Sequence, residues 1–215
     1  TSTVEYALGT TTLSFRVTDD DGATDVATFD VTMVNVPPTA DAGGPYAGNE
    51  GDTITLDGSG SSDPGGIIDL YEWDLDNDGT FETPGVTASF PTSTSGVFTV
   101  GLRVGDGNGG FGTDSTTVTV SNVAPTAEAG GPYAGDENAV IVVDGSASSD
   151  PGNDIVSYDW DLDNDGTYET PGVTGNFTSA TSGVFTIGLQ VTDDDGAVGV
   201  DTATVTVTNV VPVVD

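Results

Sequence analysis

Alternating apolar and polar residues predict β-strands along this chain. In the clearest stretch, residues 97–104, every second side chain is apolar: Phe98, Val100, Leu102 and Val104. A period of two is typical of a half-buried strand. Weaker alternation or β-branched composition predicts further strands in one half of the chain at 52–57, 67–75, 86–90 and 115–123. No helical period of 3.6 persists, and turns rich in Gly, Asp and Pro separate the segments. We therefore predict an all-β fold of the sandwich type.

This pattern recurs with a period of 87 residues. Trp73 reappears as Trp160, and residues 37–123 match residues 124–210 at 56 of 87 positions without a gap. Residues 9–36 match the last third of the same unit. A fixed period of this size indicates an array of like domains, and 87 residues suffice for a domain with its own core. The predicted division is a C-terminal part of one unit at 1–36, whole units at 37–123 and 124–210, and the start of the next linker at 211–215.

Charge and composition narrow the classes of function. The chain carries 35 Asp and Glu against two basic residues, a net charge of −33. Such a surface repels nucleic acid and anionic membranes, attracts divalent cations and tolerates high salt. The chain has no Cys, His or Lys, which removes the usual general base and any thiol chemistry. No apolar run is long enough to span a bilayer. We therefore expect no nucleic-acid partner, no membrane insertion in this segment and no enzyme.

Motifs in a fixed order point to a known family. The first unit holds Asp57-Gly58-Ser59, then Ser62-Asp63-Pro64, Tyr71-Glu72-Trp73-Asp74, Phe98-Thr99-Val100 and Thr117-Val118-Thr119-Val120, and the second unit repeats this order. This order resembles a PKD (polycystic kidney disease) domain. The resemblance implies tandem immunoglobulin-like, seven-stranded β-sandwiches in an extracellular prokaryotic surface or filament protein. This chain departs from the usual family text, WDFGDG, at residues 73–79, which read WDLDNDG.

The acidic loops after the two Trp residues predict calcium sites. Each loop places three Asp at alternate positions and then a Gly, so that carboxylates and a backbone carbonyl can surround the hard cation. Neither loop is a complete EF-hand, because Gly85 and Gly172 stand where an EF-hand has a bidentate Glu. The alternative is a solvated acidic turn. The predicted ligands are Asp74, Asp76, Asp78, Thr80 and Glu82 in the first loop, and Asp161, Asp163, Asp165, Thr167 and Glu169 in the second.

A second acidic set predicts metal at the junction between units. In an immunoglobulin-like sandwich, the loop after the third strand lies at the end where the chain leaves. The loops around Asp63 or Asp150 and the last hairpin lie at the opposite end. Tandem units would therefore bring residues 74–82 towards the acidic loops of the next unit. The predicted junction residues are Asp63, Asp150, Asp193, Asp194 and Asp195. A plain turn is the alternative, since Asp and Gly favour turns and the middle copy keeps only Asp106.

These observations favour a structural role. We expect an extracellular, cell-surface repeat array stiffened by Ca²⁺, acting as the stalk of an adhesin or the body of a filament. Its expected partners are neighbouring modules or copies of itself, with a glycan or surface ligand as a further candidate. The chain begins within a unit, which we expect to reflect truncation rather than strands supplied by a neighbour. The alternative function is an accessory polymer-binding module of a secreted hydrolase, for which exposed aromatic residues such as Phe111 would be needed. Adaptation to high salt is an alternative explanation of the acidity.

Overall fold

A computed structural model describes residues 8–211, and every regular element within them is a β-strand. The N-terminal segment forms a hairpin of β1 (Gly9–Thr18) and β2 (Thr24–Met33). The first whole repeat holds seven strands: β3 (Tyr46–Asn49), β4 (Ile54–Asp57), β5 (Leu70–Asp74), β6 (Thr83–Pro84), β7 (Thr87–Phe90), β8 (Gly96–Gly105) and β9 (Phe111–Ser121). The second repeat holds their counterparts: β10 (Tyr133–Asp136), β11 (Ile141–Asp144), β12 (Ile155–Asp161), β13 (Thr170–Pro171), β14 (Thr174–Phe177), β15 (Gly183–Asp193) and β16 (Val198–Thr208). Most of the predicted linker at 211–215 lies outside the described residues.

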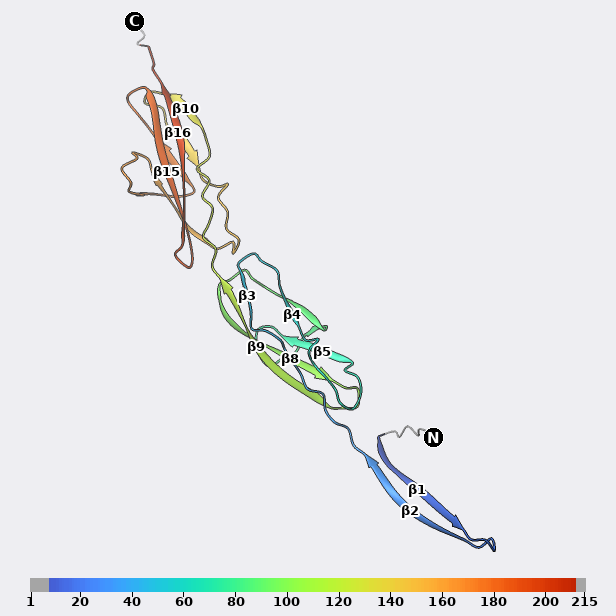
Figure 1. Cartoon of the computed structure of the whole chain (residues 1–215). Coiled ribbons are helices and arrows are strands. Elements are labelled where there is room, and N and C mark those ends of the chain that lie inside the picture. Colours follow the sequence, from blue (N-terminus) through green and yellow to red (C-terminus); the bar gives the residue numbers. More distant parts are fainter. Residues whose placement is uncertain (1–7, 212–215) are drawn as a thin grey trace. The chain divides into compact units, whose positions relative to one another are not determined.

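Both repeats have the same strand order. A five-stranded sheet runs β3-β9-β8-β5-β6 in the first repeat and β10-β16-β15-β12-β13 in the second. Figure 1 labels β3, β5, β8 and β9 of the first sheet and β10, β15 and β16 of the second. The remaining two strands pair separately, as β4-β7 and β11-β14. The first strand of each repeat lies parallel to the last one, whereas β5-β8, β11-β14, β12-β15 and β15-β16 are antiparallel pairs. Seven strands in two sheets confirm the predicted immunoglobulin-like sandwich.

By its internal contacts the chain divides into two compact units. The first unit comprises Thr1–Gly44, Leu56–Ala88 and Thr99–Thr116, and the second comprises Pro45–Thr55, Ser89–Phe98 and Thr117–Asp215. The second unit therefore holds the whole second repeat together with β3 and neighbouring loops of the first repeat. This matters for the site, because residues of both repeats meet inside this one unit.

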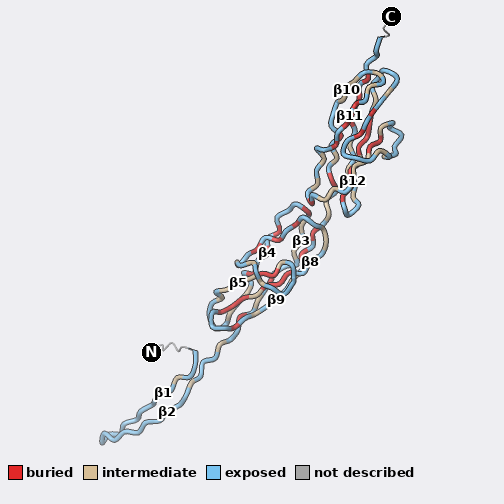
Figure 2. Tube along the Cα trace, turned by 180° about the vertical axis from the view of Figure 1, so that it is seen from behind, coloured by how far each residue is buried: buried red, intermediate tan, exposed pale blue. Residues whose placement is uncertain are grey.

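A single apolar cluster holds the second repeat together. It joins side chains from both sheets, including Val143 on β11, Trp160 on β12 and Leu189 on β15. Figure 2 shows this burial along the strand interiors. The Trp160 indole N–H donates to the carbonyl oxygen of Gly172 at 3.0 Å, so its one polar group is satisfied in the core. Gly145 permits the packing, since a Cβ there would lie 2.7 Å from Leu189 Cδ2. Trp160 is therefore a central part of this core.

The first unit buries the equivalent positions. Trp73, Leu102 and Val104 have no exposed surface, and the Trp73 indole N–H donates to the Gly85 carbonyl oxygen at 3.1 Å. The predicted alternation along β8 is thereby confirmed. Arg103, on the opposite face of β8, forms an ion pair with Glu72 and lies over the Phe81 ring, 4.9 Å from its centroid.

The N-terminal hairpin carries the same sequence pattern on an open face. Phe15 is 62% exposed and Val17 is 50% exposed, although their repeat equivalents, Leu102 and Val104, are fully buried. Phe15 and Val17 are exposed because the described residues hold no counterparts of the first five strands of a repeat, against which this hairpin could pack.

Candidate metal sites

The two Asp loops have nearly the same geometry. In each, three carboxylates can bring one oxygen apiece within 4.8 Å of one another: Asp74, Asp76 and Asp78 in the first repeat, and Asp161, Asp163 and Asp165 in the second. Asn77 and Gly79 adopt positive φ angles of 57° and 91°, which turn the chain around the carboxylates. The counterparts Asn164 and Gly166 repeat these angles within a few degrees, at 60° and 89°.

Backbone amides organise each loop around its first carboxylate. Asp74 is buried at the end of β5, where it accepts the N–H groups of Asp78 at 3.2 Å and Gly79 at 2.9 Å. Asp161 accepts the N–H groups of Asp165 and Gly166 at the same two distances. These bonds alone are sufficient for a stable acidic turn. Each carboxylate oxygen has a further lone pair, so the same arrangement can also receive a cation.

The outer members of the predicted loops are placed differently. All the outer acidic residues are exposed, but they differ in their grouping. The three-carboxylate groups include Asp76, Asp78, Asp163 and Asp165, but neither group includes Glu82 or Glu169. The Thr80 N–H donates to Asp78 Oδ1 at 2.7 Å, and the Thr167 N–H donates to Asp165 Oδ1 at 2.8 Å. Calcium binding by either loop remains a prediction.

The last-hairpin acids have local partners. Asp193 is 1% exposed, and its carboxylate accepts the Ala197 N–H at 2.7 Å and the Asn122 side-chain N–H at 3.0 Å. Asp195 accepts the Ser95 hydroxyl at 2.5 Å. Burial is the main cause that raises the pKa of Asp154, with Asp150 next; the carboxylate of Asp194 is a smaller cause, which indicates that Asp154 and Asp194 lie close together. Asp63, in the first unit, accepts the Gly65 N–H at 2.9 Å and belongs to none of the three-carboxylate groups found within residues 8–211.

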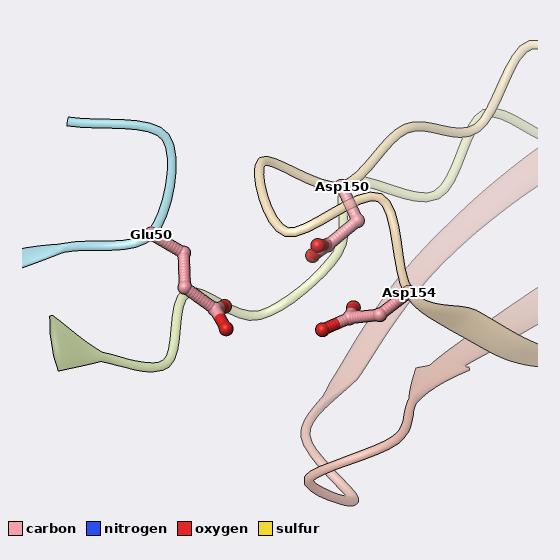
Figure 3. A group of neighbouring side chains, drawn as sticks. All are labelled: Glu50, Asp150 and Asp154. Carbon is pink, nitrogen blue, oxygen red and sulfur yellow. The ribbon is translucent and has the colours of Figure 1, made fainter. Parts of the chain in front are cut away.

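A third group of carboxylates includes residues that we did not predict from the sequence. Glu50, Asp150 and Asp154 lie in the second compact unit, and their ligand atoms come within 4.8 Å of one another (Figure 3). Only Asp150 was predicted as a junction residue. Asp154 was detectable, because it replaces Ile67 in an otherwise similar turn. A comparison of the two repeats could not single out Glu50 as a ligand, because the second repeat also has a glutamate, Glu137, at the equivalent position.

The Asn before each repeat supports a buried aspartate. The Asn35 side-chain N–H donates to Asp106 Oδ2 at 2.5 Å, as Asn122 does to Asp193. This bond is the main cause that lowers the pKa of Asp106 below its ordinary value; burial opposes it, and backbone N–H groups lower the pKa further. A depressed carboxyl pKa contributes stability above the unfolded-state pKa, and that stability is lost as the pH falls through the folded-state pKa.

We expect Asn35→Ala to raise the pKa of Asp106 towards its ordinary value and to lower stability near neutral pH. The reason is the loss of the side-chain donor that favours the charged carboxylate. The measurement is an NMR pH titration of the Asp106 carboxyl carbon. Asp57 is the internal control, because the Ser59 backbone N–H is the main cause of its own lowered pKa. An unchanged Asp106 titration in the variant would contradict the prediction.

Comparisons with known proteins place the chain in a family. The PKD domain family matches residues 35–120 and 122–208. "Dyslexia-associated protein KIAA0319" of Homo sapiens is 34% identical over 93% of this chain and 20% of its own length, and the "Dyslexia-associated protein KIAA0319-like protein" of Mus musculus is 35% identical over 71% of this chain and 16% of its own length. The chain thus spans about a fifth of the length of these relatives. Because both relatives are mammalian, they give no support to the predicted prokaryotic origin.

The chain is also similar to solved structures, at low sequence identity. The eight N-terminal immunoglobulin domains of Down Syndrome Cell Adhesion Molecule are 16% identical, with 93% of this chain and 28% of that chain covered and a TM-score of 0.40. Drosophila N-cadherin EC1-4 is 14% identical, with 93% of this chain and 58% of that chain covered and a TM-score of 0.30. Two family matches, covering both seven-stranded repeats, show that this chain belongs to the PKD domain family.

Proposed function

We propose that this chain is part of an extracellular, cell-surface repeat array that Ca²⁺ stiffens, serving as the stalk of an adhesin or the body of a filament. The observation that carries the proposal is the duplicated Asp loop, which sets three carboxylates within 4.8 Å of one another in each repeat. Three negative charges this close repel one another unless a cation neutralises them. Calcium prefers six to eight oxygen ligands, and carboxylates supply up to two each.

The repeat organisation supports a structural role over catalysis. Two PKD domains follow each other with near-identical cores, and the paired carboxylates occur on short loops in duplicate. Repeated domains supply length and valency, whereas an enzyme seldom needs the same site twice in succession. Among the described residues, no helix has the length and apolarity needed to cross a membrane. The proposed partners are neighbouring modules or copies of this chain.

Aromatic placement disfavours the alternative of a polymer-binding module from a secreted hydrolase. Trp73 and Trp160 have no exposed surface, so neither can stack on a sugar ring. Phe111 is 56% exposed, but the Arg103 guanidinium lies over its ring, 5.6 Å from the centroid. Pull-down of the chain with insoluble polysaccharides tests this alternative directly, and retention on one polymer in the presence of EGTA would favour it.

Calcium is expected to narrow the distribution of distances between the two repeats. The chain has no cysteine, so Thr87→Cys together with Thr174→Cys provides two labelling positions at equivalent, exposed places on β7 and β14. We expect single-molecule energy transfer between dyes at these positions to show a narrower distribution in millimolar Ca²⁺ than in EGTA.

A pair within the second repeat, Thr174→Cys with Thr206→Cys, is the matched control, because both residues are exposed members of one sandwich. Its distribution should not change with Ca²⁺. Equal widths for the inter-repeat pair in Ca²⁺ and in EGTA would contradict the stiffened array.

A further inference from the structure

The carboxylates of Glu50, Asp150 and Asp154 converge from three segments of the second compact unit. Glu50 lies in the turn between β3 and β4, Asp150 lies in the turn after Ser149, and Asp154 directly precedes β12. Figure 3 shows their carboxylates pointing towards a common space. By sequence, Glu50 belongs to the first repeat and the two aspartates belong to the second.

These carboxylates contain buried oxygens without partners. Glu50 is only 3% exposed, yet its Oε1 has no hydrogen-bond partner. Asp150 Oδ1 and Asp154 Oδ1 are likewise buried and have no hydrogen-bond partner. A buried polar atom without a partner is costly, and a buried charge is more so unless it is paired or binds a metal. A bound cation would satisfy these oxygens and balance the charge of the three carboxylates.

The second repeat provides an internal comparison for Glu50. Its equivalent, Glu137, accepts the Ser182 N–H at 2.8 Å through Oε1 and the Val210 N–H at 3.3 Å through Oε2. Glu50 keeps only the second of these bonds, from the Val123 N–H to Oε2 at 3.3 Å. Glu50 thus lacks the second backbone donor of its counterpart Glu137, at the place where Asp150 and Asp154 lie across from it (Figure 3).

Close packing holds the two sides of the cluster together. Gly51 follows Glu50 with a φ of +77°, and a Cβ at this position would lie 2.9 Å from Pro151 Cβ, beside Asp150. Each of the three carboxylates offers one oxygen, and these oxygens all lie within 4.8 Å of one another. Three closely spaced carboxylates are therefore expensive to ionise together without a counterion.

We propose that Glu50, Asp150 and Asp154 form a Ca²⁺ site that ties the β3–β4 turn of one repeat to the loop before β12 of the next. This inference deepens the proposed function and rests on it, since it names the residues through which calcium would restrain the link between repeats. The three carboxylates can supply up to six oxygens, which meets the lower limit of calcium coordination. Magnesium demands a tighter octahedral shell and gives up its water reluctantly, so we expect weaker binding of Mg²⁺.

The test is calorimetric titration of the intact chain with Ca²⁺, comparing wild type with Glu50→Gln and Asp154→Asn. Each variant removes a charge while retaining an acceptor oxygen, and for Glu50 this preserves the bond from the Val123 N–H. We expect each variant to lose one bound Ca²⁺ per chain, or to weaken that site at least tenfold. Melting in EGTA checks folding, and removal of one of the repelling charges should leave the Tm unchanged or raise it.

Two matched controls lie at the equivalent positions. Glu137→Gln changes the glutamate that has two backbone donors, and Asp63→Asn changes the counterpart of Asp150 in the repeat where Ile67 replaces Asp154. Both should retain the wild-type calcium stoichiometry. Loss of the same site in these controls, or unchanged binding in both Glu50→Gln and Asp154→Asn, would overturn the proposed site.

The inter-repeat energy-transfer pair separates this inference from the function on which it rests. Calcium narrowing that disappears in Glu50→Gln supports both. Narrowing that persists in Glu50→Gln overturns the proposal that the Glu50 site ties the two repeats and leaves the calcium-stiffened array standing. A site lost in Glu50→Gln without any narrowing in wild type supports the site and overturns stiffening. Failure of the wild-type chain to take up Ca²⁺ overturns both.

Discussion

Millimolar Ca²⁺ is expected to raise the melting temperature of this chain by roughly 10 °C or more over its value in EGTA. A ligand that binds only the folded state at one hundred times its Kd stabilises that state by about 2.7 kcal/mol. In a domain of this size, each kcal/mol shifts Tm by about 4–8 °C. The measurement is thermal unfolding followed by circular dichroism at constant ionic strength.

The charge of the chain makes salt controls essential. With a net charge of −33, any cation screens self-repulsion and stabilises the fold to some extent. Mg²⁺ at equal concentration and NaCl at equal ionic strength should therefore give clearly smaller shifts. Combining Asp76→Asn with Asp163→Asn should reduce the rise in Tm caused by Ca²⁺. Asp25→Asn should not, because Asp25 belongs to none of the three-carboxylate groups that the described residues form. Equal shifts in all three salts would mean that the Asp loops are solvated turns.

Replacement of Trp160 by Ala is expected to destabilise the second repeat by about 3–5 kcal/mol. The side chain is fully buried among both sheets, so its loss leaves a large cavity and removes the donor to the Gly172 carbonyl oxygen. Single domains are stable by only about 5–15 kcal/mol, so this change approaches the whole stability of one repeat. Trp73→Ala should have an equal effect on the first repeat.

The two tryptophans make this prediction easy to check. In Trp160→Ala the only remaining indole is Trp73, whose fluorescence then reports urea unfolding of the first repeat alone. Hydrogen exchange in β15 and β16 reports the second repeat. We expect faster exchange in these strands and a nearly unchanged Trp73 transition, because repeats in arrays interact mainly through their interfaces. A simultaneous loss of both signals would show that the repeats unfold as one cooperative unit.

The sequence predicted the strands that have a clear period of two. β8 was predicted because its apolar residues alternate and its inward positions, such as Leu102 and Val104, are fully buried. β3 and β6 were not predicted. Tyr46–Asn49 contains small residues and is a strand because it pairs in parallel with the distant β9. Thr83–Pro84 is too short for any period.

The limits at the candidate sites have a similar origin. The Asp loops could be predicted as candidate sites because their carboxylates lie within a few residues of one another along the sequence. The Glu50, Asp150 and Asp154 cluster gathers residues a hundred positions apart, and only the fold brings them together. The sequence did not show that Asp74 is buried: it is 3% exposed because it ends β5 and accepts backbone N–H groups from its loop.

One difference between the repeats gives the proposed array a means of adjustment. Asp154 completes a carboxylate cluster, whereas its counterpart Ile67 is 78% exposed and takes no part in the core. A single substitution at this position changes the local charge without disturbing the packing around Trp73 or Trp160. In a chain of many repeats, the residue at this one position would set the Ca²⁺ concentration at which each link between repeats stiffens. The stiffness of the array would then vary from link to link instead of following its average composition.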